Sequence, residues 1–446
     1  MIMRAAISTA IAAFGLIVAI ANVAVADETS SAKSVVVDVD RVRAAGLRVI
    51  AGKHLTLYTD LPASAAVDEL PRVFDAAVPQ WAHYFKADPA KVAGWKSQAF
   101  LIKDKAKFVQ AGVYPSFLPD FKNGFAADAD LWLYEQPSDY YRRHLLLHEG
   151  THGFMLTQLG SCGAAWFSEG VAELAATHRW DPAAAAGRQL TLGHIPRSRE
   201  EVPEWGRIAS IKADLKVGRF RAIGDLVDDS VRGFGDVESY AWCWALCLYL
   251  NRHPRYQERF NGLLAEVRRP DFNAEFRKRF AADLADMNRE WAVFANELEY
   301  GVDVPRTAID FRSGSPSGST GAKVDVAVDR GWQSSGIKLE AGKKYRVRAS
   351  GRFQVAAVDG KPWPCEAGGI TIRYFRGKPL GMLVGAVEPD VNPAGSETAL
   401  LRPQPLGLET VIAPAKSGTL YLRINDSVGE LDDNSGKLSV EITPVP

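Results

Sequence analysis

The segment that most constrains the fold of this chain is His148-Glu149-Gly150-Thr151-His152, which is followed by Glu169. Histidines four residues apart project from the same face of an α-helix, so their imidazoles can bind one metal ion. A catalytic zinc ion takes three protein ligands and keeps one open position, and Glu169 supplies the third ligand. The spacing therefore predicts two helices that face each other across a zinc site.

Three neighbouring residues have predicted roles of their own. Glu149 points away from the histidine face, where its carboxylate could take a proton from the attacking water, so we predict a general base. Glu173 follows Glu169 by one helical turn and is predicted to hold an imidazole N–H of a ligating histidine. His144 lies one helical turn before His148, and we interpret it as a neighbour of the site with a structural role only. A contact to substrate or to a ligand is the alternative for His144.

The sequence around the motif predicts where the two helices begin and end. Ser138 offers an N-cap, residues 139–159 have a helix-compatible pattern, and Gly160 is a typical helix end. After a short turn that contains glycine and cysteine, residues 166–178 predict the second helix. Both helices would carry the zinc ligands near their centres.

This pattern resembles the gluzincin metallopeptidases, in which HExxH is followed by a glutamate ligand in a second helix. The stretch WFSEGVAE, residues 166–173, is similar to the peptidase MA-like family of bacterial secreted proteins. The resemblance covers roughly residues 50–300. It implies an α+β zincin-like domain in which the two histidines and Glu169 bind Zn²⁺, and in which Glu149 is the catalytic base. The reaction that it implies is hydrolysis of a peptide or protein substrate by a zinc-activated water.

An apolar helical run over residues 238–250 is predicted to pack behind the two helices. Tyr240, near its start, matches the position at which gluzincins place a phenol opposite the metal. Its O–H would stabilise the oxyanion that develops in the transition state, so the resemblance makes Tyr240 a second catalytic residue. The alternative is a core tyrosine whose hydroxyl lies at the rim of the core.

Residues 123–134 predict one strand directly before the first helix. In families of this kind, the strand that borders the cleft binds the substrate backbone as an additional strand. Gly124 and Ala126 are therefore candidate substrate-binding residues. An ordinary strand with a bend at small residues is the alternative.

The first residues have the form of a signal peptide. A short basic start is followed by the apolar run 5–23 and by Ala24-Val25-Ala26, which suits a signal peptidase. We predict that residues 1–26 are removed and that the chain works in the periplasm or outside the cell. An uncleaved membrane anchor is the alternative, and no later segment is long and apolar enough to span a membrane.

Composition excludes some partners and limits the cysteine chemistry. The 53 basic residues equal the 53 acidic ones, so no bulk attraction to nucleic acid is expected. The four cysteines do not form a disulfide framework and are predicted to be free thiols, with a bridge from Cys162 to a helical cysteine as the alternative. They are Cys162, Cys243, Cys247 and Cys365.

The chain is predicted to be multidomain, with a boundary near residues 310–322. This stretch is rich in serine and glycine and has the composition of a flexible linker. The zincin-like domain would occupy residues 27–309. Its other predicted elements are a strand at 49–61, a helix at 66–85, a strand at 97–102 and helices from 207 to 294.

Residues 323–446 alternate short strands with glycine-rich turns, which predicts an all-β jelly-roll or sandwich domain. The strands are expected at 344–349, 369–374, 419–424 and 437–443. The fold class is therefore an α+β domain followed by an all-β domain.

The turn before the last strand is dense in oxygen donors, which suit Ca²⁺. Its spacing resembles the galactose-binding lectin of the PA-I type. That resemblance implies calcium ligation by the side chains of Asp426, Asp433 and Asn434 and by the carbonyl of Glu430, with a carbohydrate or cell-surface glycan as partner. Asp433 stands where the family has asparagine, and no histidine follows His253 to contact the sugar. A polar hairpin turn is the alternative.

Two function classes follow from these patterns. The first is a secreted zinc metallopeptidase that carries a calcium-, carbohydrate- or surface-binding module. The second is a non-catalytic binding or scaffold protein with a degenerate peptidase-like domain. Zinc-dependent hydrolysis of another substrate class would use the same metal chemistry.

Overall fold

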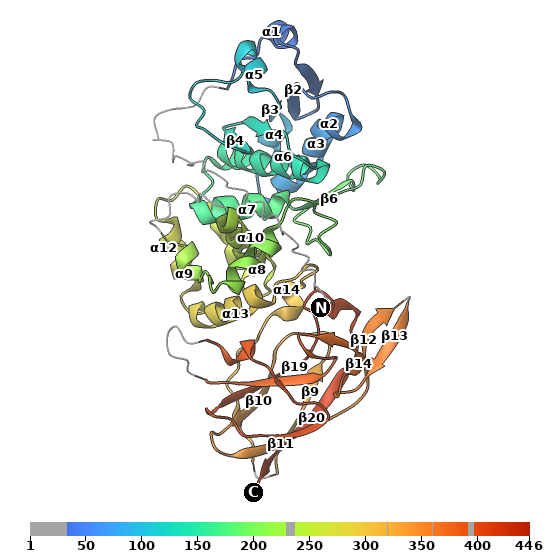
Figure 1. Cartoon of the computed structure of the whole chain (residues 1–446). Helices are drawn as coiled ribbons and strands as arrows, with labels where there is room; N and C mark the ends of the chain where they lie inside the picture. The colour runs from blue at the N-terminus through green and yellow to red at the C-terminus, as the bar shows by residue number, and fades with distance from the viewer. Residues whose placement is uncertain (1–33, 229–236, 319, 359, 391–396) are drawn as a thin grey trace, which may run out of the picture.

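A computed structural model describes residues 34–228, 237–318, 320–358, 360–390 and 397–446. The chain forms a mixed α/β part that contains most of the helices, followed by a strand-rich C-terminal part (Figure 1). The predicted signal peptide, residues 1–26, lies outside the described residues. Within them, the search for a helix that could cross a membrane finds none.

The N-terminal part is built on a five-stranded sheet with the strand order β1-β2-β3-β5-β4. Strands β2, β3 and β5 are parallel, whereas β1 and β4 pair antiparallel with their neighbours at the two edges. The strands are β1 (Arg48–Ala51), β2 (Leu55–Thr59), β3 (Ser97–Ile102), β4 (Gly124–Ala127) and β5 (Asp130–Tyr134).

Residues 49–61 and 123–134 were each predicted to form a single strand. Both predictions were wrong, because each segment forms a hairpin of two strands. Residues 49–61 contain β1 and β2, and residues 123–134 contain β4 and β5. The second turn forms because Asp128 adopts a left-handed backbone with φ 51°, a conformation that aspartate tolerates better than most residues. Because of this turn, β4 becomes an edge strand.

Side chains alternate between the two faces of this sheet, as a strand repeat of two residues requires. On β3, Ala99 and Leu101 belong to the core shared with α3 (Leu70–Tyr84) and α6 (Asp139–Phe154). Phe100 and Ile102 face a separate core, to which α1 (Val39–Ala44) and α5 (Lys105–Ala111) contribute. The sheet is thus covered by helices on both faces.

Helix α6 and the π-helical turn that follows it together cover the predicted span of residues 139–159. Ser138 Oγ accepts a hydrogen bond from the backbone N–H of Tyr141 at 3.1 Å, which caps the first turn. The helix continues as a π-helical turn, η1 (Met155–Leu159), and ends at Gly160 in the left-handed conformation, with φ 78°.

Helix α7 (Ala165–Ala176) lies between α6 and the apolar helix α10 (Val237–Arg252) (Figure 1). The contact with α10 is close, because a Cβ at Gly170 would lie 2.5 Å from the carbonyl oxygen of Cys243. The predicted helix 166–178 is two residues too long, since His178 begins the short strand β6 (His178–Trp180), which pairs with β7 (Leu190–Leu192).

The remaining helices complete the N-terminal part. The predicted helix 66–85 is broken at Glu69, which puts Pro71 in the first turn of α3, where its missing N–H costs little. The other helices are α2 (Ala65–Asp68), α4 (Pro89–Ala93), α8 (Arg207–Lys216), α9 (Ile223–Leu226), α11 (Gln257–Asn261), η2 (Gly262–Glu266), α12 (Phe272–Phe280), α13 (Leu284–Glu297) and α14 (Val304–Thr307).

The C-terminal part consists of two main sheets that share one hydrophobic core. The first sheet has the order β17-β16-β19-β10-β8 and the second the order β18-β11-β20-β9. Their strands are β8 (Ser315–Pro316), β9 (Ala322–Ala327), β10 (Gln333–Leu339), β11 (Lys344–Ser350), β16 (Leu383–Glu388), β17 (Gln404–Pro405), β18 (Glu409–Ile412), β19 (Gly418–Ile424) and β20 (Lys437–Val445).

Smaller elements project from these sheets. Two hairpins pair β12 with β13 and β14 with β15, and two short 3-10 helices, η3 and η4, lie in the connections. They comprise β12 (Phe353–Val358), β13 (Lys361–Cys365), β14 (Ile370–Phe375), β15 (Lys378–Leu380), η3 (Ala399–Leu401) and η4 (Leu431–Asp433).

The two parts contact each other directly. Arg423 of β19 pairs with Glu297 at the end of α13 at 2.6 Å, and both side chains are buried. Ser427 Oγ donates to Glu299 at 2.7 Å, and Val428 O accepts from the backbone N–H of Asp303. The segment predicted as a linker also joins the sandwich, because β8 pairs with β10.

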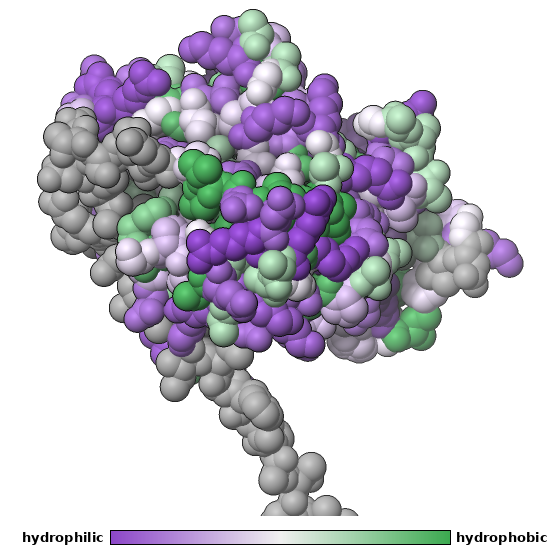
Figure 2. Space-filling model, turned by 90° about the horizontal axis from the view of Figure 1, so that it is seen from above, coloured by the Kyte–Doolittle hydropathy of each residue, from purple (hydrophilic) through white to green (hydrophobic). Residues whose placement is uncertain are grey.

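The surface mixes polar and apolar residues. Figure 2 shows the end of the molecule that carries α1 and α5, where hydrophilic side chains predominate and smaller hydrophobic areas lie between them. This agrees with the equal numbers of acidic and basic residues.

Candidate metal centre

Three side chains from α6 and α7 converge on one point. His148 and His152 present their Nε2 atoms 3.2 Å apart, and Glu169 Oε2 lies 3.2 Å from the first and 3.4 Å from the second. The carboxylate oxygen is buried and has no hydrogen-bond partner among the described residues. The structure thus brings together the three side chains that the sequence predicts as zinc ligands.

The size of this triangle fits a metal ion. Donor atoms bound at about 2.0–2.2 Å around a tetrahedral zinc ion lie about 3.3–3.6 Å from one another. The three observed separations, 3.2, 3.2 and 3.4 Å, are close to that range. Two nitrogen atoms and one carboxylate oxygen are also ligand types that zinc prefers.

The other ring nitrogen of each histidine has a polar neighbour. His148 Nδ1 lies 3.4 Å from Glu173 Oε1, and His152 Nδ1 lies 3.3 Å from Ser168 Oγ. A carboxylate or hydroxyl beside Nδ1 restrains the orientation of the ring and so directs its Nε2 atom. Glu173 therefore lies beside His148, and Ser168 lies beside His152.

Acidic side chains outnumber basic ones among the buried groups at this centre. Glu149, Glu169 and Glu173 are buried here, and Arg207 is a buried cation that pairs with Glu173. Buried charges require compensation. Burial alone would lower the pKa of His148, but Glu169 and Glu173 outweigh burial and raise it to about 9. The two carboxylates thus favour positive charge at this position.

Glu149 lies beside the triangle and is not part of it. Burial raises the pKa of its carboxyl above the ordinary value, while the two neighbouring histidines oppose that rise. A raised pKa brings a carboxylate closer to the pH at which a general base works best. Its carboxylate packs against the backbone of Gly124, because a Cβ at that position would lie 2.5 Å from Glu149 Oε1.

Tyr240, in the first turn of α10, also reaches the centre. Its ring centroid lies 6.3 Å from that of His148, with the two rings edge to face. The negative charge of Glu169, followed by burial, raises the pKa of the phenol, so Tyr240 keeps its proton. A protonated phenol beside the ligands can donate a hydrogen bond.

Gly124 and Ala126 lie on β4, the edge strand next to α6. Among the described strands, β4 pairs with β5 alone, which leaves its other edge available to a further strand. The hairpin is held against α6 at a second point, because a Cβ at Gly153 would lie 2.9 Å from Asp128 O. These contacts fix β4 relative to Glu149.

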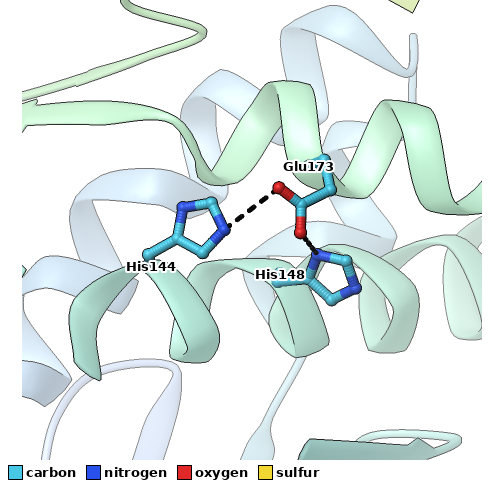
Figure 3. A group of neighbouring side chains, drawn as sticks. All are labelled: His144, His148 and Glu173. Carbon is cyan, nitrogen blue, oxygen red and sulfur yellow. Dashed lines mark ion pairs between the residues drawn. The ribbon is translucent and has the colours of Figure 1, made fainter. Parts of the chain in front are cut away.

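His144 forms a second cluster with His148 and Glu173 (Figure 3). Its Nδ1 lies 3.1 Å from the carbonyl oxygen of Ala176, and its Nε2 lies 3.3 Å from Glu173 Oε2. His144 thus contacts Glu173, the residue predicted to orient a ligating histidine. Glu173 already accepts two hydrogen bonds from Arg207, so this cluster suits a metal ion less well than the first.

Two of the predicted calcium ligands, Asp426 and Asn434, contact each other in the C-terminal part. Asn434 Nδ2 donates to Asp426 Oδ2 at 2.9 Å, and the backbone N–H of Ala357 donates to Asp433 Oδ2 at 3.3 Å. Asn434 Oδ1 and Asp433 Oδ1 are buried without a hydrogen-bond partner among the described residues. Burial raises the pKa of Asp426 to about 6, although hydrogen bonds from Asn434 and from the backbone of Ser427 oppose that rise.

The cysteines are free thiols in the structure, and they are not part of the metal clusters. Cys243, Cys247 and Cys365 are buried, whereas Cys162 is partly exposed and contacts the carbonyl oxygen of His152 through its Sγ atom. Burial raises the pKa of the Cys243 and Cys247 thiols, which makes both unreactive.

Two residues of the centre were not identified from the sequence. Ser168 precedes Glu169 directly, and a polar residue in an otherwise apolar helix was a usable signal for it. Arg207 lies 34 residues after Glu173, with which it pairs, and no local pattern indicates that contact.

No family model and no curated protein match the chain. The solved structures that resemble it include the N-terminal domain of EclA, a PllA-like lectin, at a TM-score of 0.21 and 19% identity, covering 28% of this chain and 95% of that one. They also include IMPa from Pseudomonas aeruginosa in complex with an O-glycopeptide, at a TM-score of 0.15 and 12% identity. Another is the IMPa metallopeptidase in complex with T-antigen, at a TM-score of 0.16 and 13% identity.

Both IMPa structures match 89% of this chain, which spans 42% and 47% of their length. The chain thus covers less than half the length of each of these two structures. All of these TM-scores are too low to indicate a shared function.

Proposed function

We propose that the chain is a zinc-dependent metallopeptidase that acts outside the cytoplasm. The observation that supports this most is the buried triangle of two imidazole nitrogens and one carboxylate oxygen, with separations of 3.2–3.4 Å, beside a further glutamate that is not a ligand. The predicted export signal supports the location.

Each residue would have a defined role in peptide hydrolysis. His148, His152 and Glu169 would hold the zinc ion, which when bound supplies a Lewis acid that polarises the scissile carbonyl and acidifies a water molecule. Glu149 would take the proton of that water and deliver it to the leaving amine. Tyr240 would donate a hydrogen bond to the oxyanion, and the free edge of β4 would bind the substrate backbone as an added strand.

Metal analysis combined with a cleavage assay tests this proposal. We expect the purified chain to contain about one zinc ion and to cleave a pooled peptide library. Removal of the metal with 1,10-phenanthroline should abolish cleavage, and added Zn²⁺ should restore it. A chain that binds zinc but cleaves neither peptides nor folded proteins would instead support the non-catalytic scaffold.

The role of Tyr240 predicts a change in turnover rather than in binding. Loss of one oxyanion donor costs about 10²–10³ in kcat. We expect Tyr240→Phe to lower kcat by roughly this factor, with little change in KM or zinc content. Tyr256→Phe is a suitable control, since Tyr256 is also a buried tyrosine but lies outside the metal clusters. Equal kcat values for Tyr240→Phe and wild type would leave Tyr240 as a core residue only.

We also propose that the C-terminal part binds Ca²⁺ through Asp426, Asp433 and Asn434. The supporting observation is that Asp433 Oδ1 and Asn434 Oδ1 are buried and have no hydrogen-bond partner within the described part of the chain. A ligand at 100 times its Kd stabilises the folded state by about 2.7 kcal/mol. Ca²⁺ at that excess should therefore raise the Tm of the wild type.

The Ca²⁺-dependent rise in Tm should disappear in Asp426→Ala, as measured by thermal unfolding. Asp432→Ala is the matched control, because Asp432 lies in the same loop but is exposed and pairs with Arg197. A wild-type Tm that does not respond to Ca²⁺ would contradict the calcium site and leave a polar turn.

A further inference from the structure

Arg207, the first residue of α8, is a buried cation that binds one carboxylate in two places. Its Nε donates to Glu173 Oε2 at 3.0 Å and its Nη2 donates to Glu173 Oε1 at 2.7 Å. Only 5% of the residue is exposed. This bidentate geometry is the strongest that an arginine makes with a carboxylate, and it fixes the plane of the carboxylate.

The same two oxygens face the histidines of α6. Oε1 lies 3.4 Å from His148 Nδ1, and Oε2 lies 3.3 Å from His144 Nε2, so Glu173 stands between the two rings (Figure 3). Arg207 is therefore connected to a predicted zinc ligand through one carboxylate. The order of contacts is Arg207, Glu173, His148 and the metal position.

Without Arg207, Glu173 would lose the group that fixes its orientation. A buried carboxylate that has lost its cation turns toward another donor or takes up a proton. In either case it would no longer keep its 3.4 Å contact with His148 Nδ1 in a fixed direction. The Nε2 lone pair of His148 would then point less accurately at the metal position.

We propose that Arg207 is a positioning residue of the metal centre, which acts through Glu173 to hold His148 in the orientation that binds zinc. The inference rests on the proposed function. It also assigns the cluster of His144, His148 and Glu173 to this support, with the guanidinium as its cation in place of a second metal ion.

Zinc affinity provides a test that does not depend on turnover. Loss of a group that orients a metal ligand typically lowers metal affinity about 10- to 100-fold. We expect Arg207→Met to weaken zinc binding by about this factor, measured by competition with a chromophoric chelator. The visible spectrum of the Co²⁺-substituted variant should change as well, because it reports the geometry around the metal. The zinc affinity of Arg207→Lys should lie between those of Arg207→Met and the wild type, because lysine supplies the charge without the bidentate contact.

Arg142→Met is the matched control. Arg142 is also a buried arginine and lies on α6 itself, but its partners are Glu135 and Asp139, and it contacts none of the ligands. The Arg142→Met variant should be less stable than the wild type but should keep the zinc affinity and the Co²⁺ spectrum of the wild type. Equal zinc affinities for Arg207→Met and Arg142→Met would overturn the inference.

A double-mutant cycle shows whether Arg207 acts through Glu173. In a Glu173→Gln background, Arg207→Met should weaken zinc binding little further, because the connecting carboxylate is already gone. The double variant also removes both buried charges at once, so it serves if Arg207→Met alone does not fold. Full additivity of the two affinity losses would contradict the proposed order of contacts.

The results that would refute the proposed function differ from those that would refute the positioning role of Arg207. A wild-type chain without zinc affinity, or one that binds zinc and cleaves nothing, would refute the proposed function. A wild type with tight zinc binding and an Arg207→Met variant that equals it would refute only the positioning role.

Discussion

The Glu149→Gln variant is expected to hydrolyse peptides about 10²- to 10⁴-fold more slowly than the wild type, which is the usual contribution of a general base. Glutamine has nearly the same shape but cannot accept the proton of the attacking water. Glu149 is not part of the ligand triangle, so the variant should keep its full zinc content. Single-turnover cleavage together with elemental analysis measures both quantities on one sample.

Glu258→Gln is the control for this change, because Glu258 is an exposed glutamate on α11, outside the metal clusters. It should behave as the wild type. A Glu149→Gln variant with wild-type turnover would show that another group takes the proton. A variant that has lost its zinc would show that Glu149 supports the metal instead.

A second large effect is expected at Gly124. In Gly124→Ala, the new Cβ would lie 2.5 Å from Glu149 Oε1 and 2.8 Å from its Cγ, so the glutamate side chain must move. The strand itself can accept alanine, since Gly124 does not have a positive φ. A misplacement of about 1 Å can cost about 100-fold in rate. We expect a fall in kcat of roughly that size, with zinc content and Tm close to those of the wild type.

Gly94→Ala is the matched control, because a Cβ at Gly94 meets no atom within 4 Å and its φ is −93°. Its kcat should not change. A normal kcat in Gly124→Ala would mean that Glu149 has a second productive position. A low Tm in that variant would mean that the new methyl group disturbs the packing between β4 and α6 instead of displacing Glu149 alone.

The metal centre was the most predictable feature because its residues are local in sequence. The spacing of His148 and His152 requires a helix, and Gly160 ends that helix where expected. The second helix needs only a short turn to bring Glu169 back. Local spacing therefore suffices to predict that these side chains meet, because helical geometry alone determines their positions.

The errors arose where long-range packing or one backbone angle decides the structure. Residues 123–134 have the composition of one strand, but the left-handed backbone of Asp128 folds them into a hairpin. The pairing of Arg207 with Glu173 depends on how α8 packs on α7, which spacing along the chain does not encode. The segment 310–322 has a linker composition, yet two of its residues pair with β10 once the sandwich is formed.

The contact between the two parts determines how they can work together. The buried pair of Arg423 and Glu297 and the close approach of Gly429 to Tyr300 hold the sandwich against the helices. A module on a flexible tether samples many orientations and raises the local concentration of its ligand over a broad volume. Here the buried ion pair and the backbone contacts restrict such sampling. A surface recognised by the sandwich would therefore meet the helical part over a narrower range of orientations than a flexible tether allows.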